Sequence, residues 1–106
     1  MPKYLLQVSY TLDGIKGLRT EGGSARVAAV TRATEAAGGK VESMYFAFGD
    51  HDAYVIVEYP ENTTAAGAAL AVTAAGGAKV RTVVLLTPAE VDAAVNMEST
   101  YRPPGG

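Results

Sequence analysis

The residues best suited to chemistry lie in two short segments of the chain. Asp50-His51-Asp52 places an imidazole between two carboxylates. An imidazole has an ordinary pKa of about 6.5, which suits a general base or a metal ligand. The second segment is Glu21-Gly22-Gly23-Ser24-Ala25-Arg26. A glycine pair before a helix start exposes backbone N–H groups where the helix dipole favours an anion. Arg26 would add a charged, two-pronged donor to that anion site.

Both segments also have an ordinary structural interpretation. Adjacent residues of a tight turn point in different directions, and Asp is common in turns for conformational reasons, so Asp50-His51-Asp52 is more typical of a hairpin turn than of a catalytic group. The glycine pair equally suits a kink between two helical pieces, and it matches neither the Walker nor the dinucleotide-binding signature. The sequence therefore predicts no metal site and no cofactor.

Four strands and four helical segments are expected to position these residues. Apolar alternation predicts strands over residues 3–10, 41–48, 53–59 and 79–86. Helices are expected over 11–20, 25–37, 62–75 and 89–96, with Ser24 as N-cap of the second and Thr87 of the last. The order β-α-β-β-α-β predicts an α+β, ferredoxin-like plait with an antiparallel sheet in the order 4-1-3-2, helices on one face and a short C-terminal helix. Residues 1–98 form one domain, and 99–106 a loose tail.

This topology brings the two segments to the same end of the domain, because the first strand, the second helix and the hairpin all meet there. Free backbone donors near Ser24, together with the Arg26 cation, favour a ligand with a carboxylate or similar anionic group. The apolar body of the ligand would lie against tyrosines. The predicted ligand-binding residues are Tyr10, Ser24, Arg26, Asp50, His51 and Asp52.

Two further patterns concern packing. The helix over 62–75 is rich in alanine and is expected to lie close to the sheet, because alanine is a good helix former that fills small gaps. The third and fourth strands are apolar on both faces, and 106 residues cannot supply a second covering layer. We therefore expect a homodimer in which two sheets pack face to face, with Leu5, Tyr54, Ile56 and Val83 in the interface. The tyrosines on the strands serve either such packing or a pocket for an aromatic ligand.

Composition excludes several classes of function. The net charge of −2 argues against nucleic acid as a partner. The chain has no cysteine and one histidine, which excludes disulfides and makes a Ser/His/Asp triad improbable. No segment looks like an export signal, and the alanine-rich stretch is too short and weakly apolar to span a bilayer, so we expect a cytoplasmic protein with no membrane partner.

Several segments together resemble the GYD domain family: MPKYLLQVSYT, GIKG followed by EGGSAR, GGKVESMYFAFGDHDAYVIVEYP and LLTPAEVDAA. The resemblance spans roughly residues 2–94. It implies a small bacterial protein similar to the dimeric α/β-barrel group, without an agreed activity. The motif that names the family is a glycine followed by Tyr-Asp; here Gly49 and Asp52 match and His51 replaces the tyrosine, so no role of a tyrosine hydroxyl is carried over.

Two functions remain open from the sequence. One is a small-ligand-binding or regulatory module with a pocket between helices and sheet. The other is a cofactor-independent enzyme (monooxygenase, isomerase or cyclase) acting on a hydrophobic or aromatic molecule, for which His51 with Asp50 or Asp52 is the candidate acid/base pair. The single histidine on an exposed turn favours binding. A purely structural subunit of a larger assembly is a third alternative.

Overall fold

The computed structural model describes residues 1–106 as a mixed α+β fold with four strands and four helices. The strands lie close to the segments expected from apolar alternation, and the helical region before β2 is divided at Gly22, as the glycine pair indicated. The elements in chain order are β1 (Lys3–Tyr10), α1 (Leu12–Glu21), α2 (Gly23–Ala36), β2 (Lys40–Phe46), β3 (Ala53–Glu58), α3 (Asn62–Ala74), β4 (Ala78–Leu85) and α4 (Pro88–Val95).

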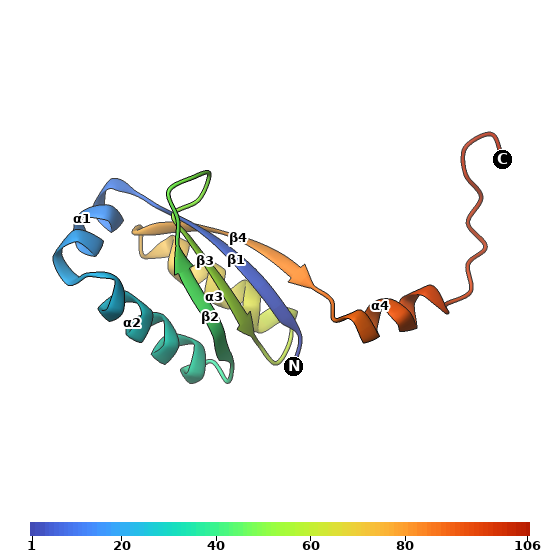
Figure 1. Ribbon diagram of the computed structural model, residues 1–106, viewed down its shortest axis with the longest axis horizontal. Helices are drawn as coiled ribbons and strands as arrows, with labels where there is room; N and C mark the ends of the chain where they lie inside the picture. The colour runs from blue at the N-terminus through green and yellow to red at the C-terminus, as the bar shows by residue number, and fades with distance from the viewer.

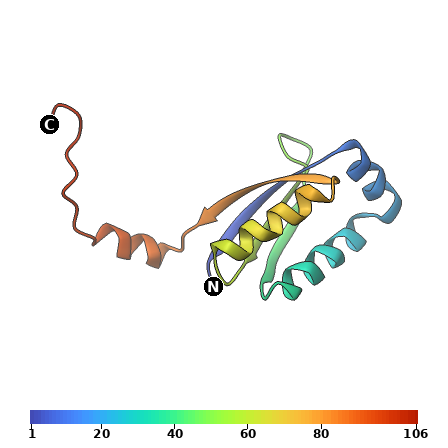
Figure 2. The ribbon, with the colours of Figure 1, turned by 180° about the vertical axis from the view of Figure 1, so that it is seen from behind.

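The four strands form one antiparallel sheet in the order β2-β3-β1-β4, which has the same neighbours as 4-1-3-2 read from the opposite edge. β1 is central, and Leu6 lies between Val55 of β3 and Thr82 of β4. The register slips between Val41 and Ser43, where β2 carries a bulge. Helices α2 and α3 lie on the same face of the sheet, and the other face has no helix (Figure 1 and Figure 2).

A small core lies between the sheet and its two covering helices. Tyr4, Val55, Val57, Tyr59 and Ala65 form one buried cluster. The rings of Tyr4 and Tyr59 pack with their centroids 5.9 Å apart, and the Tyr4 hydroxyl donates a hydrogen bond to the Asn62 side chain at the start of α3. Only eight of the 106 residues are buried. Most apolar side chains therefore keep some contact with solvent, on both faces of the sheet.

The start of α2 differs from the expectation. Ser24 was predicted to cap this helix, but the N-cap residue is Gly22, and no side chain makes a cap hydrogen bond. Gly22 has φ of 85°, a left-handed conformation that glycine adopts at no steric cost and serine does not. The chain therefore turns at Gly22, and Ser24 falls inside the first turn of α2. The prediction of Ser24 as the cap was wrong.

Helix α1 packs tightly on the loop between α3 and β4. A Cβ atom on Gly14 would lie 1.9 Å from the Gly77 carbonyl oxygen, so only glycine permits this approach. Thr11 fixes the contact: its N–H donates to Gly77 O at 3.0 Å and its hydroxyl to Gly76 O at 2.8 Å. The loop thus lies beside the end of β1.

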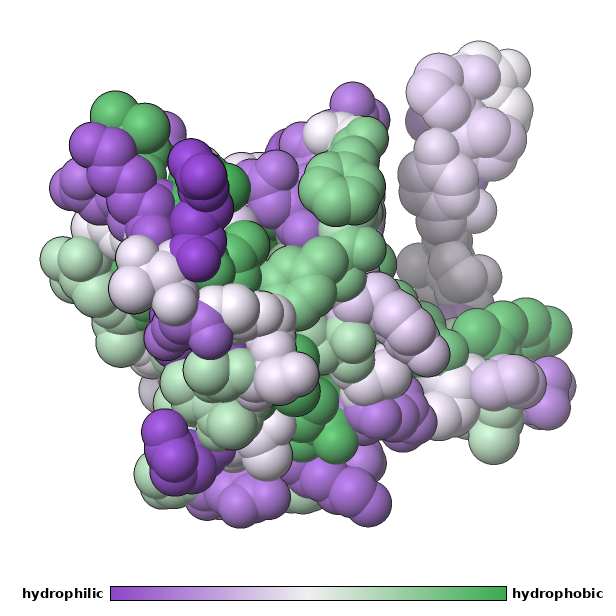
Figure 3. Space-filling view, turned by 60° about the vertical axis from the view of Figure 1, so that its left-hand side comes forward, coloured by the Kyte–Doolittle hydropathy of each residue, from purple (hydrophilic) through white to green (hydrophobic).

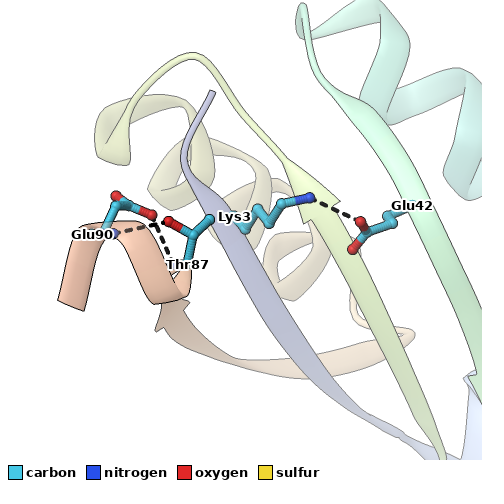
Figure 4. Close-up of polar contacts among 4 residues, drawn as sticks. All are labelled: Lys3, Glu42, Thr87 and Glu90. Carbon is cyan, nitrogen blue, oxygen red and sulfur yellow. Dashed lines mark hydrogen bonds and ion pairs between the residues drawn. The ribbon is translucent and has the colours of Figure 1, made fainter. Parts of the chain in front are cut away.

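The C-terminal segment extends away from the sheet, and α4 lies clear of the other elements (Figure 1). Its first turn is stabilised locally by a capping box in which the Thr87 hydroxyl accepts from Glu90 N–H and the Glu90 carboxylate accepts from Thr87 N–H (Figure 4). That backbone hydrogen bond lowers the pKa of Glu90. Val95 of α4 remains 76% exposed.

None of the four helices has the length and apolar character needed to cross a membrane.

Candidate ligand-binding site

A cleft of about 590 Å³ lies between α2 and α3, with the sheet as its floor. Figure 2 shows the two helices side by side on this face without crossing. Seventeen of its 21 lining residues are hydrophobic. Those from the sheet include Leu6, Val8, Met44, Val55 and Val80, and those from the helices include Ala29, Val30, Ala33, Ala65, Ala68, Ala69 and Val72.

Small side chains keep the cleft open. α3 presents Ala65, Ala68 and Ala69 to it, and α2 presents Ala29 and Ala33. The alanine-rich helix was expected to fill a small gap close to the sheet. Ala65 does so, being buried against the core, but Ala68, Ala69 and Ala71 line an open cavity. Larger side chains at these positions would have closed the space between the helices.

Arg26 and Tyr10 supply polar groups to this apolar lining. The Arg26 Nε lies 3.3 Å from Oε1 of Glu21, yet it is buried and has no hydrogen-bond acceptor in the correct geometry. Burial raises the pKa of Tyr10, and the nearby Arg26 cation opposes that rise. The Tyr10 hydroxyl is consequently a neutral donor at physiological pH, beside a cation with an unused N–H.

The hairpin between β2 and β3 connects to the end of β1 by two backbone-directed bonds. Asp52 N–H donates to Val8 O at 2.8 Å, and Tyr10 N–H donates to Oδ2 of Asp52 at 2.8 Å. Asp52 therefore holds the strand end that carries Tyr10. Its carboxylate has a structural partner, which accounts for an aspartate at this position without any catalytic role.

His51 lies on the opposite side of the sheet from the cleft. Its Nδ1 shares a hydrogen bond of 3.0 Å with the Ser9 hydroxyl, and its ring packs edge-on against Tyr54 with centroids 5.8 Å apart. Ser9 and Tyr54 alternate with Tyr10 and Val55, which line the cleft. Since successive side chains of a strand point to opposite faces, His51 belongs to the helix-free face.

The structure brings the six predicted residues to one end of the domain but not into one cavity. Tyr10 and Arg26 line the cleft, whereas Ser24, Asp50, His51 and Asp52 do not. Asp50 is exposed on the hairpin. No three acidic, histidine or cysteine side chains come together as a metal site would require. The contact of these six residues with a ligand stays a prediction.

Sequence reasoning missed most of the apolar lining. One signal for it was present: Ala29 and Ala33 of α2 and its C-cap residue Ala37 recur every four residues, which places them on one face of the helix, and all three line the cleft. A stripe of small residues on each of two helices that share one face of a sheet indicates a gap between them. Neither the small residues of α2 nor those of α3 would have indicated this gap alone.

Comparison with known proteins gives one match. The model of the GYD domain family matches residues 4–95 of the 106-residue chain. No curated protein and no solved structure matches it. The match covers β1 through α4 and so includes every strand of the sheet and both helices that border the cleft. The chain belongs to the GYD domain family.

Proposed function

We propose that this protein is a small-ligand-binding module whose ligand lies in the cleft between α2 and α3. The observation that carries the proposal is the cleft itself. Its volume of about 590 Å³ falls within the range of roughly 300–1,000 Å³ typical of small-molecule sites. Its lining is apolar with a few polar groups, which is the usual composition of such sites. The apolar body of a ligand would replace water over this surface.

The chemistry of the lining favours binding over catalysis. Its titratable side chains are Tyr10, Arg26 and Tyr59. A cofactor-independent enzyme, the alternative function, would need an acid/base pair, for which His51 with a neighbouring aspartate is the candidate. His51 is bonded to Ser9 on the helix-free face, with the sheet between it and the cleft. A substrate in the cleft would therefore meet no imidazole or carboxylate among the lining residues.

We also propose that the module is a homodimer of ferredoxin-like plaits, of the dimeric α/β-barrel type, joined through the helix-free sheet face. Apolar exposure on this face supports the proposal: Tyr45 is 72% and Val83 38% exposed. Charge supports a second copy as the occupant. The helix-free side of β4 carries Lys79 and Arg81, and α4 carries Glu90 and Asp92, so a partner's α4 has the complementary sign. A second copy would thus cover the sheet and give α4 a surface to contact.

The cleft is tested with N-phenyl-1-naphthylamine, a neutral apolar dye that becomes fluorescent in dry sites. We expect saturable binding to the wild type and loss of binding by about tenfold or more in Ala69→Phe, because the ring fills the cavity. Ala66→Phe is the matched control, since Ala66 lies on the same helix but outside the lining. Ala29→Leu narrows the cleft from α2 and should act like Ala69→Phe. Unchanged dye binding in both folded cleft variants would overturn the proposal.

A further inference from the structure

The Arg26 side chain holds a donor that the fold leaves without an acceptor. Its Nε is buried and makes no hydrogen bond, although Oε1 of Glu21 lies 3.3 Å away. Leaving a buried charged N–H unpaired is unfavourable, so an oxygen acceptor arriving at this group recovers free energy that Glu21 does not supply. The guanidinium is therefore poised to receive an anion.

Glu21 is electrostatically misplaced for this pairing. It is the last residue of α1, where the negative end of the helix dipole disfavours a carboxylate. Arg26, in contrast, lies in the first turns of α2. The N-terminus of α2 has neither a side-chain cap nor an acidic residue in its first turn. No acidic residue of α2 itself compensates the positive end of its dipole, which favours an anion on the α2 side of Arg26.

Arg26 is also the one residue that lines two separate cavities. The first is the apolar cleft, and the second is a polar hollow of about 360 Å³ bordered by α1 and the Gly76-Gly77 loop. Glu21 belongs to the hollow and not to the cleft. Arg26 therefore lies at the boundary between the hollow, which contains Glu21, and the apolar cleft. Its side chain is 37% exposed as a whole, although Nε itself is buried.

We propose that the ligand is a hydrophobic carboxylic acid whose carboxylate binds the Arg26 guanidinium in place of Glu21, beside the Tyr10 hydroxyl. This inference rests on the proposed function, because it needs the cleft to hold the apolar body. The side chain of Arg26 supplies one positive charge, which one carboxylate neutralises. A phosphate would bring about two charges towards the Glu21 carboxylate. The oxygen of a neutral ligand would accept from Nε without competing with Glu21 for the charge, and a cationic ligand would be repelled.

Figure 3 shows this side of the molecule, with α1 and α2 turned forward. Apolar side chains, in green, lie between hydrophilic projections, in purple. Binding would also release Glu21 from Arg26, so that the contact between the end of α1 and the start of α2 depends on the ligand.

The test compares decanoate with 1-decanol, which share a ten-carbon chain and differ in the charged head. Each is titrated at pH 7 against the dye N-phenyl-1-naphthylamine bound to the full chain. We expect decanoate to displace the dye at about 10- to 150-fold lower concentration than decanol, the range for hydrogen bonds to charged groups. Arg26→Gln should abolish that preference, because it removes the charge that the carboxylate binds. Glu21→Gln should strengthen the binding of decanoate but not of decanol, because it removes the carboxylate that competes for Arg26.

Each result decides one of the two proposals. Equal displacement by decanoate and decanol, or a decanoate preference that survives Arg26→Gln, overturns the carboxylate inference while the cleft stands. Failure of both compounds to displace bound dye also overturns it. If the affinity for the dye is unchanged in both Ala69→Phe and Ala29→Leu, the proposed function itself is overturned. Circular dichroism checks that the variants fold, and Arg26→Lys, which keeps the charge but loses the planar fork, should retain part of the preference.

Discussion

The two faces of the sheet differ in what covers them and in what their side chains can do. On one face α2 and α3 bury Tyr4, Val55 and Val57 and leave an apolar cleft between them. The other face has no helix, and it carries His51 against Ser9 and Tyr54. The single histidine, which was the candidate acid/base residue of the sequence, thus lies on the face without the cavity.

This difference shows why residue type is a weaker guide than placement. The alternation of β1 sends Ser9 and Tyr10 to opposite faces, so two neighbours in the sequence contact different parts of the molecule. Arg26 reaches the cleft because it lies on α2, which covers the sheet. The hairpin lies at the end of the sheet, and the Asp52 carboxylate accepts a hydrogen bond from Tyr10 N–H at the end of β1. A site predicted from one end of the fold therefore divides between the two faces.

The largest effect is expected from a charge at the centre of the helix-free face. Ile56→Lys should dissociate the proposed dimer, raising its dissociation constant by about 100-fold or more, since a two-fold axis brings the new charge near its own copy. Light scattering at micromolar concentration measures the change. Ala66→Lys, at an exposed position of α3, is the control and should leave assembly unaltered. A monomeric wild type under these conditions would contradict the dimer.

A second large effect, on stability, is expected at Val57, which follows Ile56 in β3 and lies on the helix-covered face. Val57 is 0% exposed, so Val57→Ala should lower the free energy of unfolding by about 2–3 kcal/mol and the Tm by roughly 10–20 °C. Val84→Ala is the matched control, because Val84 is 55% exposed, and its effect should stay within about 0.5 kcal/mol. Equal losses in thermal denaturation would show that the two valines are equally buried.

The fold was largely predictable because its signals are local. Apolar alternation marked the four strands, the glycine pair marked the break between α1 and α2, and Thr87 with Pro88 marked the start of α4. The cap of α2 was not predictable from preference alone. Ser24 is a favoured capping residue, but the left-handed turn needed a glycine, and Gly22 was available two residues earlier.

The candidate site was predictable only in part because a cavity is a property of several elements at once. Topology correctly brought Tyr10 and Arg26 towards one another, and both line the cleft. Whether alanines on two helices fill a gap or leave one depends on the distance between the helices, which no local pattern specifies. The buried Nε of Arg26 likewise follows from packing, so no sequence pattern announces it.

Removal of a tyrosine hydroxyl should have an intermediate effect on stability, and the effect should differ between the two faces of the sheet. Tyr4→Phe removes the hydroxyl that donates to Asn62 at the start of α3, and should cost about 1 kcal/mol or roughly 4–8 °C in Tm. Tyr45→Phe on β2 is the control, since Tyr45 is largely exposed, and it should change stability little. A larger loss from Tyr45→Phe than from Tyr4→Phe would mean that a partner buries the Tyr45 hydroxyl.

A small effect is expected from the tail. Residues 99–106 are exposed and contain no helix or strand. Their removal should shift the Tm by only a degree or two, which corresponds to a few tenths of a kcal/mol. Light scattering on the same protein sharpens the comparison of faces. Loss of dimer on truncation would show that Tyr101 docks on the helix-free face of a second copy.

The smallest effect is local to α4 and depends on pH. The hydrogen bond from Thr87 N–H holds the pKa of Glu90 below its ordinary value of 4.5. Because the folded-state pKa is lowered, this stabilisation is present above pH 4.5 and is lost as the pH falls through the lowered value. Amide chemical shifts of Glu90 and Val91 should therefore move towards coil values below that pH, and Glu90→Gln should remove the transition. If helical shifts persist in acid, α4 is held by packing against a second copy and not by its capping box.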